Sequence, residues 1–230
     1  MRLEPKQNPY GGCIEPFCVT WQLSQPVCLS ERPLHLDALL AWARVRESLQ
    51  AGMTAQEALK AQLDLPLESA VKGDNQIWKA SALMFRFQST PFLVQMTRRT
   101  STEELAFARE TIVTTRKNKI TQGTGQFKDF DLRITCQWVE KVEAYGVGDI
   151  AAVGALLEQV SALGKLTRNG WGTIADMQIS PDSEALEKWR FRTLPSVFEK
   201  TEWHYPGIGS VRPPYWRREG WEPVWEFAGM

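Results

Sequence analysis

The residues with the clearest chemical potential lie in the run Leu163–Gly172, which mixes glycines with cations. Glycine permits positive φ angles and close backbone approach, so successive amides can converge on an anionic oxygen. Lys165 and Arg168 would add positive charge, which suits a phosphodiester backbone better than a single tight phosphate cradle. The structural alternative is that Gly164 is only a helix C′ cap and that the other glycines form a turn.

Known nucleotide-binding motifs do not account for this run. A P-loop follows a strand, opens a helix and ends in Gly-Lys-Ser/Thr, so that the lysine and the hydroxyl meet phosphate and magnesium. Here Gly164-Lys165 comes first, and a predicted helix precedes the run. A dinucleotide fingerprint is excluded as well, because the glycine spacing differs and no strand comes before the glycines.

A second basic segment, Thr111–Lys128, carries no acidic residue. Its flexible Gln122–Gly125 stretch and its single aromatic residue predict a finger that lies along RNA and orders on contact. The alternative is an ordinary solvated loop. The residues of this segment that we predict to bind RNA are Arg116, Lys117, Lys119, Gln122, Gly123, Phe127 and Lys128.

A third candidate site is in the C-terminal tail, where cations are mixed with aromatic side chains. Aromatic faces contribute about 1 to 3 kcal/mol per base in single-strand binding. The alternative is an aromatic plug that closes the core, which we favour for Trp221 and Trp225. The tail residues that we predict to bind RNA are Arg212, Tyr215, Trp216 and Arg217.

Groups that could support catalysis are sparse. His35 stands at a helix entrance, where capping or packing is the commoner role. His204 could act as a general base in metal-independent RNA cleavage, but no partnered acid or nucleophile is evident. The four cysteines lack the spacing of a zinc ribbon, which predicts reduced thiols in a reducing compartment. We therefore expect no metal, no cofactor and no catalytic residue.

Length and composition predict one folded domain over residues 1–230. Hydrophobic residues make up 43% and charged residues 23%, which is ordinary globular usage. The 27 basic and 27 acidic side chains cancel, so any role with nucleic acid must depend on where the charge lies. The N-terminus shows no signal peptide, and no apolar run approaches the roughly 20 residues that span a bilayer, so we expect a cytoplasmic location.

The hydrophobic pattern predicts an α+β fold. Helices are expected over Leu36–Ala43, after a Thr54–Glu57 capping box, over Ser101–Arg109 and after an Asp149 cap. With one strand assigned to an excursion, the order fits a ferredoxin-like βαββαβ core with two helices on one face of an antiparallel sheet. The predicted strands are Phe17–Leu23, Ile77–Phe87, Phe92–Thr97, Phe130–Trp138, Thr173–Ile179 and, more weakly, Trp189–Thr193.

Several of these segments, taken in order, resemble a known family. The chain is similar, from about Phe17 to Trp216, to the RAMP-superfamily subunit of type IV CRISPR systems that corresponds to the crRNA 5′-handle-binding subunit of other effector complexes. Each segment alone is weak, whereas the ordered set is fairly specific. The segments are Leu34–Ala43, Gly125–Lys128, Gly148-Asp149, Leu163–Gly172 and Pro213–Trp216.

This resemblance implies an RRM-like core and a β-hairpin thumb, which maps to residues 111–130. We further expect a C-terminal extension over residues 181–230 packed on the core. It also implies a glycine-rich loop that holds RNA after the last core helix. The residues of that loop that we predict to bind RNA are Gly164, Lys165, Arg168, Asn169, Gly170, Trp171 and Gly172.

The resemblance further implies a non-catalytic subunit that caps the 5′ handle of the guide RNA in a ribonucleoprotein complex for defence against plasmids and phage. The implied partners are the crRNA, a repeating backbone RAMP subunit and a large subunit, with target DNA nearby. A separate RAMP nuclease usually matures the guide in type IV systems, which agrees with the sparse catalytic groups. Related subunits in one other subtype cleave RNA, so a metal-independent endoribonuclease that processes precursor crRNA is the alternative. A scaffold whose glycine loop contacts only protein is a third reading.

Overall fold

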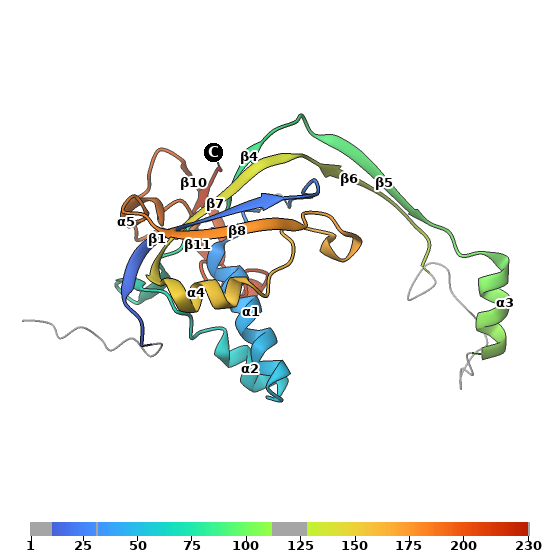
Figure 1. The fold of residues 1–230 in the computed structure, drawn as a ribbon, viewed down its shortest axis with the longest axis horizontal. Helices are drawn as coiled ribbons and strands as arrows, with labels where there is room; N and C mark the ends of the chain where they lie inside the picture. Colours follow the sequence, from blue (N-terminus) through green and yellow to red (C-terminus); the bar gives the residue numbers. More distant parts are fainter. Residues whose placement is uncertain (1–10, 31, 112–127, 230) are drawn as a thin grey trace, which may run out of the picture.

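The central element is a four-stranded antiparallel sheet with helices on one face. The structure, a computed structural model, describes residues 11–30, 32–111 and 128–229. The strands β1 (Ile14–Leu23), β4 (Met84–Phe87), β7 (Val139–Asp149) and β8 (Ile174–Pro181) are arranged in the order β4-β7-β1-β8. Helices α1 and α4 both lie on one face of this sheet (Figure 1). The predicted α+β class is therefore confirmed.

The connections of this sheet follow the order strand, helix, strand, strand, helix, strand. Helix α1 (Leu36–Gln50) links β1 to β4, and α4 (Ile150–Leu157) links β7 to β8, so each helix crosses over a strand that is inserted between its partners. This is the arrangement of a βαββαβ unit. Its core is formed by Phe17, Val19 and Trp21 of β1, all fully buried against the two helices and the neighbouring strands.

Local capping signals in the sequence are confirmed. The Asp149 carboxylate accepts a hydrogen bond from the Ala152 amide at 3.1 Å, at the start of α4. Thr54 and Glu57 form a reciprocal capping box at the start of α2 (Ala55–Ala61). Each such cap satisfies amide donors that the first turn of a helix leaves without partners.

No helix in the described part of the chain is long and apolar enough to cross a membrane.

A second sheet and a short hairpin complete the body of the molecule. The C-terminal residues form a three-stranded sheet in the order β10 (His204–Gly209), β11 (Glu222–Phe227), β9 (Leu194–Pro195). It packs on the core through Ile77, Val147, Leu194 and Val224. The strand predicted over Trp189–Thr193 is wrong, because these residues form turns that direct Arg192 inward. The remaining elements are β2 (Ser69–Lys72), β3 (Asn75–Trp78), α5 (Ala185–Lys188) and the 3-10 turns η2 (Thr167–Asn169) and η3 (Arg218–Gly220).

A two-stranded ribbon projects from the body and is here called the arm. It consists of β5 (Phe92–Arg98), the helix α3 (Thr102–Thr111) and β6 (Phe130–Cys136), with α3 at its far end (Figure 1). The strict alternation of apolar residues predicts a half-exposed strand over Phe130–Trp138, and the sequence does not fix which predicted strand belongs to the excursion. The alternation gives the ribbon one apolar face, on which Val94 pairs with Ile134 and Met96 with Leu132. The projecting strands thus extend beyond the predicted residues 111–130.

The third strand of the central sheet is β7, which the sequence pattern did not predict. Its helix-facing positions are filled largely by small residues, so the hydrophobic alternation is weak. The small residues are required by close packing: a Cβ at Gly146 would lie 2.6 Å from the Phe17 ring, and one at Gly148 would lie 2.2 Å from the Pro66 carbonyl oxygen. Close packing against distant segments therefore requires small residues at these positions of β7, and hydrophobic periodicity alone does not reveal the strand.

The expectation of reduced thiols is wrong for two of the four cysteines. Cys28 and Cys136 form a disulfide across 108 residues of sequence, next to a pair of backbone hydrogen bonds between Val27 and Gln137. Cys13 and Cys18 are free. The disulfide joins the segment after β1 to the base of the arm.

Among the described residues, no group of three or more potential metal ligands lies together.

A buried ion pair joins the C-terminal segment to the core. The Arg192 guanidinium and the Asp37 carboxylate are both fully buried, with Nη2 of Arg192 3.1 Å from Oδ2 of Asp37. Arg192 also donates to the carbonyl oxygens of Trp78, Ala80 and Val211. Because a buried charge is tolerated only where its donors are satisfied, this arrangement fixes three segments around one side chain.

We predict that Arg192→Ala lowers the free energy of unfolding by about 3 to 5 kcal/mol, because it leaves the Asp37 carboxylate buried without its counter-ion. The exposed Arg46→Ala provides the control and should cost about 0.5 kcal/mol or less. Urea unfolding monitored by tryptophan fluorescence measures both variants. A loss below about 1 kcal/mol for Arg192→Ala would show that this ion pair does not hold the C-terminal segment.

Candidate nucleic-acid interface

Two adjoining hollows form a continuous groove along the β4 edge of the body and the base of the arm. The first, here called the aromatic pocket, has a volume of about 360 Å³ and lies between β4, the segment before α1 and the C-terminal sheet. The second, here called the basic hollow, has a volume of about 1150 Å³ and reaches β6. The two share the lining residues Leu29, Ser30, Arg32 and Lys165.

Three cations line this groove. Arg32 and Lys165 line both parts, and Arg133 of β6 lines the basic hollow. No carboxylate belongs to the described residues that line either hollow. None of the three cations forms an ion pair within the described part of the chain, and the Arg32 guanidinium lies 4.4 Å from the centre of the Trp221 ring. Their charge is thus available to an anionic ligand.

The glycine loop, residues 163–172, has the backbone conformation that its sequence predicts. The order helix, loop, strand is confirmed, and Gly164, Gly170 and Gly172 all have positive φ. The alternative of a helix C′ cap at Gly164 is wrong, because α4 ends at Leu157. A Cβ at Gly172 would lie 2.0 Å from the Leu163 carbonyl oxygen, so this glycine is required by the close approach of the chain to itself.

The loop is held to the segment after β1 by two of its own amides. Lys165 N donates to the Cys28 carbonyl oxygen at 2.7 Å, and Gly172 N donates to the Pro26 carbonyl oxygen at 2.8 Å. These amides are therefore engaged within the chain. The amides of Leu166, Thr167 and Arg168 have no acceptor among the described residues, which leaves them free for a ligand.

The structure brings only some of the predicted loop residues into the groove. Lys165 and Gly164 line it, whereas Arg168, Asn169 and Gly170 are exposed on the loop outside the two hollows. Trp171 is half-buried and Gly172 is buried. Lys165 is therefore the cation of the loop that lines the groove, and the second cation, Arg168, is only nearby in the sequence.

The predicted tail residues lie apart from this groove. Tyr215 is a structural residue: its hydroxyl donates to the Asp37 carboxylate at 2.8 Å and its ring stacks on His35 with centroids 4.5 Å apart. Burial raises its pKa well above the ordinary value. Arg212 and Arg217 line a different hollow of about 720 Å³ beside α2, and Trp216 is 74% exposed.

Most of the predicted basic finger lies outside the residues that the structure describes. These residues are Arg116, Lys117, Lys119, Gln122, Gly123 and Phe127. Lys128 is exposed and directly precedes Asp129 and β6, at the end of the arm away from the body (Figure 1). Their predicted contact with RNA stays a prediction.

Sequence reasoning missed the residues of the groove that come from other segments. Arg32 stands in the loop before α1, and Arg133 was read only as the polar face of a strand. Phe85 and Phe87 lie in the strand predicted over Ile77–Phe87, with no binding role assigned to them, and Phe87 is 42% exposed. Two aromatic residues at positions i and i+2 of a short edge strand are a signal that could have identified this wall.

Both histidine rings form hydrogen bonds with backbone groups of the chain. Nε2 of His35 accepts a hydrogen bond from the Thr193 amide at 3.2 Å. Nδ1 of His204 accepts one from the Thr201 amide at 3.1 Å, and its Nε2 lies 2.9 Å from the Arg192 carbonyl oxygen. Burial lowers the pKa of each ring, and the charge of Arg192 adds to this effect at His35. Both rings are therefore neutral near pH 7.

Comparison with known families gives a match over nearly the whole chain. The family model described as CRISPR type IV associated protein Csf3 matches residues 15–226. The matched residues include the central sheet, the glycine loop, both strands of the arm and most of the C-terminal sheet. No curated protein matches the chain.

We predict that the chain loses stability as the pH falls below about 6.5, the ordinary pKa of histidine. Because the folded-state pKa of His35 and of His204 is lowered, the unfolded state binds protons that the folded state does not, and each ring can cost up to about 1.4 kcal/mol per pH unit. Urea unfolding between about pH 7.5 and 5.5 measures this slope. His35→Gln keeps an acceptor for the Thr193 amide and should flatten it. An equal slope in both proteins would contradict the assignment to His35.

Proposed function

The chain belongs to the family of CRISPR type IV associated protein Csf3, a type IV CRISPR effector component, and from this premise we propose that it is the RNA-binding subunit that caps the 5′ handle of the guide RNA. In this proposal the strand lies in the groove, with its phosphates on Arg32, Arg133 and Lys165. The observation that carries the proposal is the convergence of these three cations from separate segments on one groove, where, among the described residues, none of them forms an ion pair and no carboxylate belongs to the lining.

A phosphodiester strand fits this surface for an electrostatic reason. The chain has no net charge, so attraction to RNA must come from a local excess of cations. The groove supplies that excess, because its lining contains cations and no carboxylate among the described residues. The free amides of Leu166, Thr167 and Arg168 lie on the same loop as Lys165 and could donate to phosphate oxygens.

The open face of the central sheet is a poorer site for RNA. An RRM stacks bases on aromatic residues of its exposed sheet face. Here the strands β1 and β7 present Thr20, Gln22, Lys141 and Glu143 to that face, and Lys141 is paired with Glu143 at 3.0 Å. Tyr145, the aromatic residue of β7, is buried beneath Lys188. The groove at the β4 edge combines cations with exposed aromatic rings and is therefore the better candidate.

The arm suits the role of a thumb that brackets the guide. It projects from the body, and its β6 strand supplies Arg133 to the groove (Figure 1). In a type IV complex it would contact the crRNA and the neighbouring repeating backbone subunit, with the large subunit and target DNA close by. Its apolar face supports this proposal, since an isolated two-stranded ribbon is at best marginally stable in water.

We propose that the subunit binds the guide without cleaving it. A general base for metal-independent cleavage must reach the reacting hydroxyl, and both histidines instead hold backbone groups of the chain. Neither lines the aromatic pocket or the basic hollow. No observation favours the alternative of a crRNA-processing endoribonuclease.

We predict that the chain, co-expressed with its CRISPR array, copurifies with guide RNA that carries a uniform 5′ handle. Lys165→Glu should lower the yield of this RNA at least several-fold, because it places a carboxylate on the groove. Lys72→Glu is the matched control, since Lys72 is exposed on β2 and lies outside the groove. Sequencing of the bound RNA is the measurement. Random cellular RNA, or equal yields from both variants, would count against the proposal.

We further predict that purified chain leaves repeat RNA intact. Incubation of labelled repeat RNA in EDTA, followed by denaturing electrophoresis, should give the same product pattern with the chain and without it. Cleavage by the unaltered chain that disappears in His204→Ala would establish the endoribonuclease instead. A thermal unfolding curve of His204→Ala is needed beside it, because this ring contacts the backbone at Thr201 and Arg192.

A further inference from the structure

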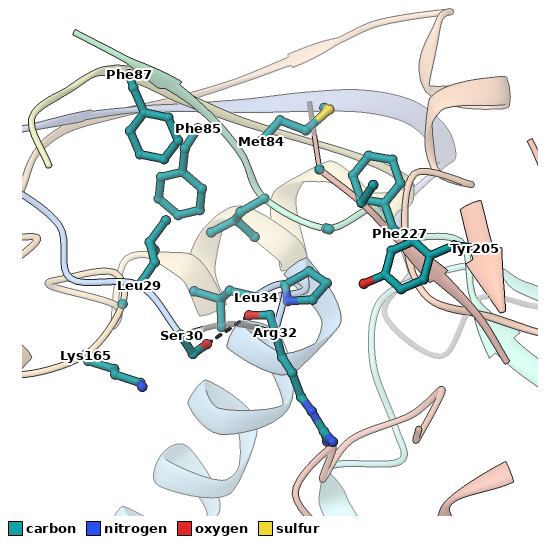
Figure 2. A pocket seen from close by; sticks show the side chains of 16 residues that line it. Leu29, Ser30, Arg32, Leu34, Met84, Phe85, Phe87, Lys165, Tyr205 and Phe227 are labelled. Atoms are coloured by element: carbon teal, nitrogen blue, oxygen red, sulfur yellow. Dashed lines mark hydrogen bonds between the residues drawn. The ribbon is translucent and has the colours of Figure 1, made fainter. Parts of the chain in front are cut away.

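The aromatic pocket has features that phosphate binding does not explain. Two walls of aromatic rings face each other across it: Phe85 and Phe87 from β4 on one side, and Tyr205 and Phe227 from the C-terminal sheet on the other (Figure 2). Lys165 and Arg32 lie away from the rings, on the side of the pocket opposite β4 (Figure 2). A ligand that fills the pocket must therefore join an apolar part to an anionic part.

The rings are held in place by contacts behind them. Phe85 packs against the central core and stacks on Phe87 with centroids 6.1 Å apart. Phe227 is buried and stacks on Phe191 with centroids 5.6 Å apart. The Tyr205 hydroxyl donates to the Glu226 carboxylate at 3.0 Å, on the adjacent strand. Contacts within the chain thus fix the walls, which lowers the entropy cost of binding a ligand.

The outer rings are nevertheless left open to solvent. Phe87 is 42% exposed and Tyr205 is 46% exposed, on opposite sides of the same pocket. A stacked aromatic pair on an edge strand offers an apolar surface on which a planar group can pack. The pocket volume of about 360 Å³ is near the lower end of small-molecule sites, so it admits one planar group and excludes a duplex.

We propose that the aromatic pocket receives a single unstacked nucleobase of the bound RNA strand. This inference rests on the proposed function and specifies it further: the strand's phosphates lie along Lys165 and Arg32, and one base turns away from its neighbours to lie against Phe87. Single-stranded RNA is commonly recognised in this way, by bases that leave the stack and lie on aromatic side chains. The pocket and the basic hollow share Lys165 and Arg32, so base and backbone can be bound together.

A fluorescent base scan tests the inference. The full chain is titrated with single-stranded RNA of about 12 nucleotides from the repeat of its own CRISPR array, a length within the range one small binding domain covers. In a matched set, 2-aminopurine replaces one base at a time. One position should be quenched on binding to the unaltered chain and should stay bright with Phe87→Ala, because stacking on an aromatic ring quenches this base.

Affinity gives the second measurement. Phe87→Ala should weaken binding about 5-fold to 100-fold with an unchanged salt dependence, because it removes a stacking surface and no charge. Lys165→Ala should instead reduce the salt slope by about 0.7, the value for one phosphate contact on a single strand. Trp42→Ala removes an aromatic residue of similar exposure, 49%, from α1 and should change neither quantity.

The outcomes separate this inference from the proposed function. If the RNA binds with the Lys165-dependent salt slope but no position is quenched and Phe87→Ala binds normally, the inference fails and the proposed function stands. If the unaltered chain does not bind the RNA at all, the proposed function fails and the inference with it. Circular dichroism and a thermal midpoint close to that of the unaltered chain establish that Phe87→Ala is folded.

Discussion

One buried guanidinium holds the C-terminal segment against the core, and the groove depends on it. Arg192 is fully buried and donates to carbonyl oxygens before β4 and beyond β10, as well as to the Asp37 carboxylate at the start of α1. Burial of a charge is unfavourable unless every donor finds an acceptor, so these segments can adopt only arrangements that supply them. The C-terminal sheet, which provides Tyr205 and Phe227 to the aromatic pocket, is positioned by this requirement.

The opposite side of the groove is positioned by backbone contacts around one short segment. Residues 26–28 accept hydrogen bonds from the Lys165 and Gly172 amides of the glycine loop. The same segment pairs with Gln137 and forms the disulfide with Cys136 at the base of the arm. The glycine loop and the arm are therefore both attached to residues 26–28. This shared attachment explains how Lys165 and Arg133 come to line one hollow although they lie far apart in the sequence.

The distribution of charge explains how a chain without net charge can be suited to RNA. Acidic and basic side chains cancel over the whole sequence, and several cations of the body are paired with carboxylates, as Lys79 is with Glu68. In the groove, Arg32, Arg133 and Lys165 are unpaired among the described residues. A local excess of this kind attracts a phosphodiester strand to one surface, while the rest of the molecule carries the balancing negative charge, which favours defined placement over general adhesion.

Local interactions of the chain were readable from the sequence, and long-range pairings were not. The capping residues Thr54 and Asp149 depend on neighbours a few residues away, so residue type alone predicts them. The glycine loop was found for the same reason, together with its cation Lys165. The family was identified because several such local segments occur in a fixed order along most of the chain.

The tertiary structure decided which strand joins the central sheet and which residues share the groove. β6 alternates more strictly than β7, yet β7 pairs with β1 because its small residues admit the Phe17 ring, which lies in a segment distant in the sequence. Tyr215 turns inward because a buried carboxylate, Asp37, needs its hydroxyl. Arg133 and Lys165 line one hollow only because the tertiary structure places β6 beside the glycine loop. Each of these outcomes depends on contacts between residues far apart in the chain, which no local pattern encodes.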